Sequence, residues 1–177
     1  MSKVSELHKV TAPKSVGLFI LTCSTSRFDQ IQAGEKSSDI SGDIIEQLTT
    51  SAGHRIEGRK LVPDSKTMIR RTAKQALASR NVDALIITGG TGLSPRDITI
   101  ETIASLITKE IPGFGELFRK VSFDKIGSAA MLSRAIGGIA KDKAVFCLPG
   151  SPDAVQTAME RLILPELGHV VRIARER

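Results

Sequence analysis

Two stretches of this chain, residues 16–22 and 84–87, are apolar throughout except for Thr22 at the end of the first. Small residues follow both stretches. A strand with one wet face alternates apolar and polar positions, whereas an unbroken run is typical of a strand buried on both faces of a parallel sheet. The first run is followed by Cys23 and Ser24, and the second by Thr88 and a glycine-rich turn. We therefore predict two central strands whose carboxyl ends carry small polar groups.

Helical periodicity fills most of the chain between and after these strands. Apolar positions spaced three and four apart predict a helix from Asp39 or Ser41 to Gly53, where glycine ends it. Further helices are predicted over 66–80, over 98–108, after the interruption at 112–116, and over 153–164, with Pro165 bending or breaking the chain before a terminal helix. Residues 54–62 indicate a weaker strand. Residues 23–38 show no period and are predicted to form a mobile loop.

A charged turn separates the last two predicted strands. Residues 135–139 and 144–148 are apolar and flank Lys141-Asp142-Lys143, a pattern typical of a β-hairpin. Together with the alternation of strands and helices, it predicts an α/β fold with three α-β-α layers, a mostly parallel sheet and an antiparallel edge hairpin. We expect a tail over residues 1–15 and one domain over 16–177.

Ligands of open parallel sheets bind beyond the carboxyl ends of the strands. Four predicted strand ends meet there and bring together Ser24, Asp64, the stretch 88–97 and the turn 149–151. Glycines 89, 90 and 92 permit positive φ and close backbone approach, so the turn suits an anion such as phosphate, although a tight turn without a ligand has the same pattern.

Composition narrows the function classes. The 177 residues carry a formal charge of +6, but basic residues are interleaved with acidic ones, and Tyr and Trp are absent. The only basic cluster expected is Arg172, Arg175 and Arg177. We therefore expect no nucleic-acid partner. No apolar run is long enough for a membrane span, and we expect a cytoplasmic location. With Cys23 and Cys147 as the two cysteines, neither a metal cluster nor a disulfide framework is expected.

The polar residues at the strand ends favour transfer of a phosphoryl or nucleotidyl group. The glycine turn lacks the lysine of a Walker A loop and the spacing of a dinucleotide fingerprint. Asp64 and Asp97 can hold Mg²⁺ with substrate phosphates, or simply cap helices. The three histidines, at 8, 54 and 169, are expected at the surface, so no catalytic serine triad is predicted. Transfer of a phosphoryl or nucleotidyl group needs no serine nucleophile, because it depends mainly on positioning of the substrates and neutralisation of their charge.

The segment Ile86-Ile87-Thr88-Gly89-Gly90-Thr91-Gly92, with Asp97 five residues later, resembles the signature of the MoaB/MogA family of molybdenum-cofactor biosynthesis proteins. Molybdenum-insertion and CinA-like domains share this signature. Further blocks resemble that family in the same order: Asp39-Ile40-Ser41-Gly42, Val62-Pro63-Asp64, Pro112-Gly113-Phe114-Gly115-Glu116, Met131-Leu132-Ser133-Arg134 and Leu148-Pro149-Gly150-Ser151. These blocks and the single-domain length of the chain favour the MoaB/MogA family over molybdenum-insertion and CinA-like domains.

The resemblance implies a molybdopterin adenylyltransferase that uses ATP and Mg²⁺ and releases pyrophosphate. It makes Asp64 and Asp97 the catalytic, metal-binding carboxylates. The remaining implied binding residues are Ser24, Thr88, Gly89, Gly90, Thr91, Gly92, Glu116, Ser133, Pro149, Gly150 and Ser151. The binding role implied for Ser24 is less direct, because the loop 23–38 departs from the family in length and sequence.

The resemblance also implies a homotrimer or a hexamer built as a dimer of trimers, and contacts with other molybdenum-cofactor enzymes. The alternatives are an oligomer that binds molybdopterin or nucleotide without turnover, and a CinA-like nucleotide pyrophosphatase.

Overall fold

The structure is a computed structural model that describes residues 12–176. Most of the predicted tail, residues 1–11, lies outside the described residues. In chain order the elements are β1 (Gly17–Cys23), α2 (Thr25–Gln32), α3 (Ile40–Ser51), β2 (Arg55–Val62), α4 (Lys66–Ala78), β3 (Ala84–Thr88), α5 (Thr99–Ala104), β4 (Lys109–Glu110), α6 (Pro112–Ile126), the 3-10 helix η1 (Gly127–Leu132), β5 (Ile136–Ala140), β6 (Lys143–Leu148), α7 (Pro152–Ala158), the π-helical segment η2 (Met159–Ile163) and α8 (Leu164–Ala174).

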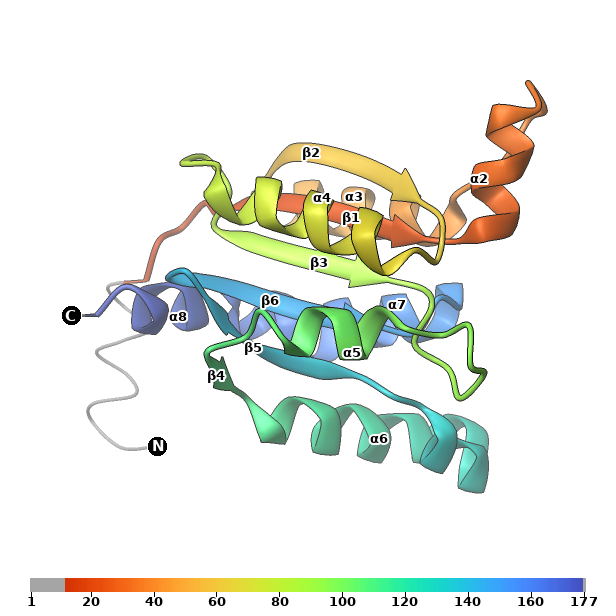
Figure 1. Cartoon of the computed structure of the whole chain (residues 1–177). Coiled ribbons are helices and arrows are strands. Elements are labelled where there is room, and N and C mark those ends of the chain that lie inside the picture. The colour runs from red at the N-terminus through yellow and green to blue at the C-terminus, as the bar shows by residue number, and fades with distance from the viewer. Residues whose placement is uncertain (1–11, 177) are drawn as a thin grey trace.

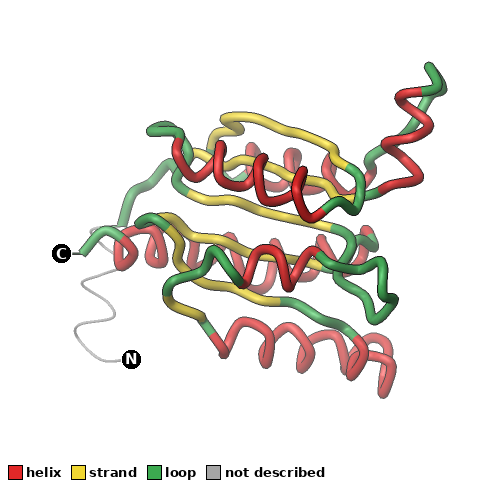
Figure 2. Tube along the Cα trace, viewed as in Figure 1, coloured by secondary structure: helices red, strands yellow, loops and turns green. Residues whose placement is uncertain are grey.

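Six strands form one sheet in the order β2-β1-β3-β6-β5-β4. The pairs β1–β2, β1–β3 and β3–β6 are parallel, whereas β5 is antiparallel to both β6 and β4. Helices lie on both sides of this sheet (Figures 1 and 2). The arrangement confirms the predicted three-layer fold with its antiparallel edge.

The two sides of the sheet bury separate apolar clusters because neighbouring strand residues point to opposite faces. On β3, Ile86 packs on one side with residues of α3, α6, α7 and α8, while Leu85 and Ile87 pack on the other side with residues of α4 and α5. All three side chains are fully buried. The unbroken apolar run of this strand therefore reflects cover on both faces, as predicted.

Local signals set several boundaries where the sequence placed them. The Asp39 carboxylate accepts a hydrogen bond from the Gly42 N–H at 3.1 Å and caps α3, and Gly53 ends this helix with φ of +81°. The predicted hairpin turn contains Lys141 and Asp142 with φ of +49° and +60°. Positive φ at both central positions matches the right-handed twist of the strands that they join.

The two-residue strand β4 and the 3-10 helix η1 were not predicted, and three further segments differ from the prediction. Residues expected as a mobile loop include helix α2, which Ser24 caps and which buries none of its residues, so it has no apolar period (Figure 1). Helix α6 begins at Pro112, because proline is tolerated at the first helical position. Instead of a break at Pro165, the helix widens over η2, where the proline ring would otherwise meet the carbonyl of Arg161.

No helix within residues 12–176 has the length and apolar character needed to cross a bilayer.

Candidate functional site

The carboxyl ends of the four parallel strands lie side by side. Thr22 of β1 is in register with Thr88 of β3, which is in register with Leu148 of β6, and Cys23 pairs with Val62 of β2. The segments that follow these residues therefore leave the sheet at one edge. This edge carries the polar groups that the sequence predicted for it.

Two glycines shape the turn after β3. Gly89 has φ of +91° and Gly90 has φ of +61°, a region that other residues rarely adopt. A Cβ atom on Gly89 would lie 2.2 Å from the Cys23 carbonyl oxygen, and one on Gly90 would lie 2.5 Å from both Asp64 Oδ1 and Thr99 Oγ1. Both positions need glycine for conformation and for space.

A cavity of about 310 Å³ opens beside this turn. It lies between the turn after β3, the segment joining η1 to β5, and the turn after β6. Nine residues predicted for the site line it: Gly89, Gly90, Thr91, Gly92, Asp97, Ser133, Pro149, Gly150 and Ser151. Three segments far apart in sequence thus converge on one cavity.

Two buried hydroxyl groups hold the turn after β6 in place. Thr88 Oγ1 donates to the Pro149 carbonyl at 2.9 Å, and Ser41 Oγ donates to the Gly150 carbonyl at 2.8 Å. Thr88 and Ser41 are almost completely buried. Thr88 therefore supports the cavity from behind, and the Gly89 N–H likewise donates to the Leu148 carbonyl at 3.2 Å.

An ion-pair network supports the same edge from α3. Arg59 Nη2 donates to Asp39 Oδ2 at 2.9 Å, and Thr22 Oγ1 donates to the same oxygen at 2.7 Å. Burial alone would raise the pKa of Asp39, but the hydrogen bonds from Thr22 and Arg59 outweigh it and lower that pKa. Asp39 thus stays ionised and fixes the start of the helix that carries Ser41.

Asp97 faces the cavity from the far side of the glycine turn. Its Oδ2 accepts a hydrogen bond from the Ser94 N–H at 3.1 Å, and a Cβ on Gly92 would lie 2.8 Å from this oxygen. The side chain is half-buried. Asp97 is therefore anchored in its own loop while it lines the cavity.

Arg134 also lines the cavity, although the sequence analysis did not select it as a site residue. Its Nη1 donates to the Gly92 carbonyl at 3.0 Å, and its Nη2 pairs with Glu101 Oε1. This hydrogen bond lowers the pKa of Glu101. The sequence signal that could have identified Arg134 is its position next to Ser133 in the block Met131-Leu132-Ser133-Arg134.

Asp64 lies outside the lining of the cavity, on the other side of Gly90. Its Oδ2 accepts hydrogen bonds from the Thr25 N–H at 3.0 Å and the Thr25 hydroxyl at 2.8 Å. Its Oδ1 is buried and has no hydrogen-bond partner among the described residues. Ser65, not Asp64, is the N-cap residue of α4, so the carboxylate is not used as a cap for that helix.

Two other predicted residues do not line this cavity. Ser24 Oγ accepts from the Arg27 N–H at 3.4 Å and caps α2, while Glu116 is exposed on α6. Neither His54 nor His169 lines the cavity, and His8 lies outside the described residues. The thiols of Cys23 and Cys147 are both free and buried.

The donors present suit Mg²⁺ better than a tightly ligated transition metal. No group of three His, Cys, Asp or Glu residues within residues 12–176 is arranged to hold a metal ion. Mg²⁺ is commonly held by one or two carboxylates, with substrate phosphates and water completing its shell. The unpartnered Asp64 Oδ1 and the Asp97 carboxylate fit that requirement.

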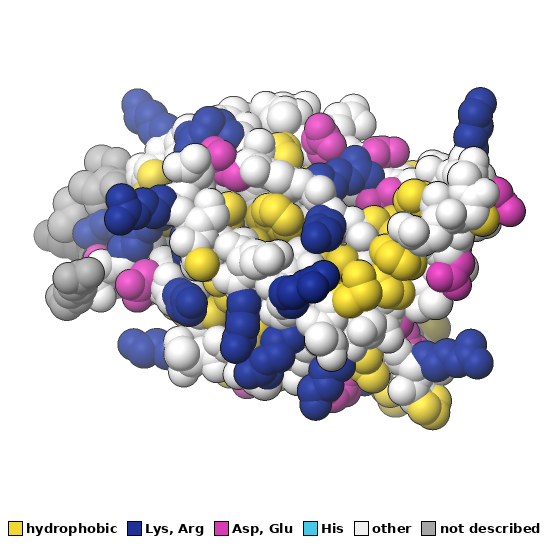
Figure 3. Space-filling view, turned by 45° about the horizontal axis from the view of Figure 1, so that its top comes forward, with side chains coloured by type: hydrophobic (Ala, Val, Ile, Leu, Met, Phe, Trp, Pro, Cys, Tyr) yellow, Lys and Arg dark blue, Asp and Glu magenta, His cyan; other side chains and the backbone are white. Residues whose placement is uncertain are grey.

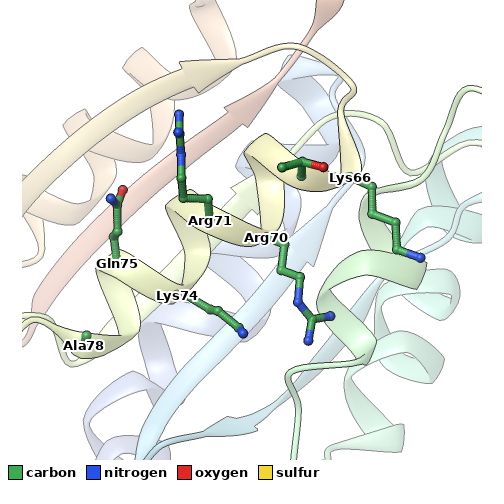
Figure 4. A pocket seen from close by; sticks show the side chains of 7 residues that line it. Lys66, Arg70, Arg71, Lys74, Gln75 and Ala78 are labelled. Carbon is green, nitrogen blue, oxygen red and sulfur yellow. The ribbon is translucent and has the colours of Figure 1, made fainter.

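Basic side chains gather along α4, a cluster that was not predicted from the sequence. Lys66, Arg70, Arg71 and Lys74 border a shallow hollow along this helix (Figure 4). Lys and Arg side chains also dominate the middle of the face shown in Figure 3. Because three of the four recur every fourth residue, a helical projection of the sequence contains the signal. The helix starts two residues after Asp64, so Lys66 lies near the strand ends and the other three follow along the helix.

The sheet order and the cavity at the strand ends define a three-layer α/β protein with a glycine-shaped polar site. The family described as "Probable molybdopterin binding domain" matches residues 19–169, and the chain belongs to this family.

Curated relatives extend over almost the whole chain. "Molybdenum cofactor biosynthesis protein B" of Bacillus cereus is 45% identical over 164 residues, which cover 92% of this chain and 93% of the relative. "Probable molybdopterin adenylyltransferase" of Methanocaldococcus jannaschii is 36% identical over 163 residues, which cover 92% of this chain and 96% of the relative.

Solved structures agree with the fold. A crystal structure of a "Molybdenum cofactor biosynthesis protein B" matches with a TM-score of 0.86 and 43% identity, covering 94% of this chain and 100% of the other. The "tungsten cofactor synthesizing protein MoaB from Pyrococcus furiosus" matches with a TM-score of 0.82 and 37% identity, covering 93% and 100%. A CinA structure from Thermoplasma acidophilum, at 19% identity and a TM-score of 0.57, shares the fold alone.

Proposed function

We propose that this protein acts in molybdenum cofactor biosynthesis as a molybdopterin adenylyltransferase, which transfers AMP from Mg-ATP to molybdopterin and releases pyrophosphate. The observation that carries the proposal is the position of the two carboxylates. Asp97 lines the 310 Å³ cavity, and Asp64 presents its unpartnered Oδ1 beside Gly90 of the same turn. The names of the relatives support the same chemistry.

In the proposed reaction a terminal phosphate oxygen of molybdopterin attacks the α-phosphorus of ATP. A new P–O bond forms, the bond from the α-phosphorus to the oxygen bridging to the β-phosphate breaks, and pyrophosphate leaves with that electron pair. The protein has to align two anionic substrates in line and neutralise their charge, and no protein nucleophile is needed.

Each part of the cavity has a role in this proposal. Backbone groups of Gly90 to Gly92 and of Gly150 and Ser151 bind phosphate oxygens, and the Ser133 hydroxyl adds a donor. Arg134 holds the Gly92 carbonyl and keeps the turn in shape. Asp64 and Asp97 would hold Mg²⁺, which would neutralise charge on the phosphates of ATP. Thr88 and Ser41 keep the turn after β6 aligned.

The proposed assembly is a trimer or a hexamer. An apolar hollow of about 580 Å³ between β4, α6 and α8 supports burial of this face against another copy, since its lining includes Leu117 and Ile173, which are 51% and 45% exposed. The cytoplasmic location and the lack of a nucleic-acid partner stay predictions.

The test measures pyrophosphate release and adenylyl-molybdopterin formation from labelled ATP, freshly prepared molybdopterin and Mg²⁺. We expect turnover by the wild type and losses of at least about 100-fold in Asp64→Asn and Asp97→Asn, the scale of removing a positioned electrostatic group. Asp124→Asn, which changes an exposed carboxylate on α6, serves as the control for charge alone.

Two results would change the assignment. If the wild type binds molybdopterin but releases no pyrophosphate, the protein is a non-catalytic binding oligomer. If both variants turn over at the wild-type rate, the carboxylates have no part in the chemistry.

A further inference from the structure

The described residues contain four buried side-chain nitrogen or oxygen atoms without a hydrogen-bond partner, and two of them lie at one glycine. The four are Thr49 Oγ1, Asp64 Oδ1, Thr99 Oγ1 and Arg172 Nη1. Asp64 Oδ1 and Thr99 Oγ1 would each lie 2.5 Å from a Cβ atom on Gly90, so the two oxygens are no more than twice that distance, 5.0 Å, apart. Because buried polar groups are almost always paired, this coincidence calls for an explanation.

Thr99 differs from its neighbour on the same short helix. The Thr102 hydroxyl donates to the Ile98 carbonyl at 2.7 Å, the usual way in which a buried helical threonine is satisfied. The Thr99 hydroxyl is fully buried and makes no such bond, although its backbone N–H donates to the Gly90 carbonyl at 3.0 Å. Its side chain is therefore held against Gly90 while its oxygen stays available.

The carboxylate of Asp64 places negative charge beside this oxygen pair. Its other oxygen, Oδ2, is held by neutral donors, the N–H and the hydroxyl of Thr25. The Asp64 carboxylate thus keeps one oxygen without a strong partner beside a neutral hydroxyl.

We infer that the Thr99 hydroxyl and Asp64 Oδ1 together bind a divalent cation at Gly90. The inference rests on the proposed function, in which Asp64 holds Mg²⁺, and it adds Thr99 as a residue of that site. Oxygen ligands lie about 2.1 Å from Mg²⁺, so one ion spans about 4 Å between two of them, which is compatible with the limit set by Gly90. Both oxygens are buried and Gly90 lies against them, so an ion reaches the pair only when the half-buried turn at Gly90 moves aside.

The test titrates the full chain with MnCl₂ alone and measures free Mn²⁺ by electron paramagnetic resonance. Thr99→Val keeps the shape of the side chain and removes the hydroxyl, and Thr99→Ser restores a hydroxyl. We expect Thr99→Val to raise the Kd for Mn²⁺ at least about tenfold, as losses of groups that support metal sites do, and Thr99→Ser to stay near the wild type. Asp64→Asn is expected to weaken binding as well.

Thr49→Val is the matched control, because Thr49 is also a fully buried threonine with an unpartnered hydroxyl but lies in α3. It should leave the Kd unchanged. Circular dichroism checks that each variant is folded, and Thr99→Ala replaces Thr99→Val if the latter does not fold.

The inference and the proposed function can fail separately. If Thr99→Val binds Mn²⁺ like the wild type, or if the wild type binds none, Thr99 is not a metal-site residue, whatever the outcome of the AMP-transfer assay. If Thr99→Val and Asp64→Asn both lose Mn²⁺ while the wild type transfers no AMP, the cation site stands and the adenylyltransferase proposal falls.

Discussion

Gly90→Ala perturbs the turn in two ways that can be separated. Alanine at φ of +61° costs about 1–2 kcal/mol through backbone strain alone. The new Cβ also meets Asp64 Oδ1 and Thr99 Oγ1 at 2.5 Å. Asp64 cannot turn away freely, because Thr25 holds its other oxygen by two hydrogen bonds. Loosening one of these hydrogen bonds to the carboxylate costs about 1.5–3 kcal/mol more.

Gly53→Ala is the control for the strain. Gly53 has φ of +81°, and nothing lies within 4 Å of its added Cβ. This variant should lose only the conformational cost of about 1–2 kcal/mol. The difference between the two variants therefore measures the contact with Asp64 and Thr99.

The assay is urea unfolding followed by far-ultraviolet circular dichroism at one protein concentration, since the chain has no Trp or Tyr for fluorescence. We expect the free energy of unfolding of Gly90→Ala to fall below that of Gly53→Ala by about 1.5–3 kcal/mol. Equal losses in both variants would refute the argument that the Asp64 and Thr99 side chains close the space at Gly90.

Three further predictions concern the support of the site and its charge. Ser41→Ala removes the hydrogen bond to the Gly150 carbonyl and should raise KM for ATP several-fold with a loss of stability of about 1 kcal/mol; an unchanged KM in steady-state assays would separate this bond from substrate binding. Asp39 has a lowered pKa, so its contribution to stability is present above its unfolded-state pKa of 3.8 and is lost as the pH falls through the lower folded-state pKa. The difference in Tm between wild type and Asp39→Asn should therefore shrink below about pH 4, and a constant difference would count against the ion-pair network. Lys74→Glu should lower kcat/KM for ATP at low salt and approach the wild type at about 0.5 M salt, whereas Lys141→Glu, at the opposite end of the sheet, should change it less; equal effects would show that the α4 cluster does not attract the nucleotide.

All strands of the sheet except the two-residue β4 could be predicted, because their signals are local. Unbroken apolar runs identified the buried strands, and the turn around Lys141 identified the antiparallel edge. Helix α2 was missed because no apolar stripe exists where a helix buries nothing. Its one local signal was Ser24, which caps it.

The part of the candidate site that follows the ends of the parallel strands could be predicted from the sequence. The convergence of Asp97 with the turn after β6 followed from parallel topology. The pairing of Arg134 with Glu101 and the placement of Thr99 against Asp64 depend on contacts between segments separated by more than 30 residues, which no local pattern encodes. The basic cluster of α4 follows from the four-residue spacing of Lys66, Arg70 and Lys74, a pattern that appears around a helix and not in the order of charges along the chain.

The direction of β5 determines which segments can reach the cavity. Because this strand is antiparallel to β6, its first residue, Ile136, pairs with Cys147 near the cavity edge, and its last residue, Ala140, pairs with Lys143 at the opposite edge. Ser133 and Arg134 therefore reach the cavity from the segment before β5, whereas the other two lining segments come after β3 and β6. The reversal also places the tight turn at Lys141 and Asp142 about as far from the cavity as the strands extend. A label attached at that turn would leave the cavity unobstructed.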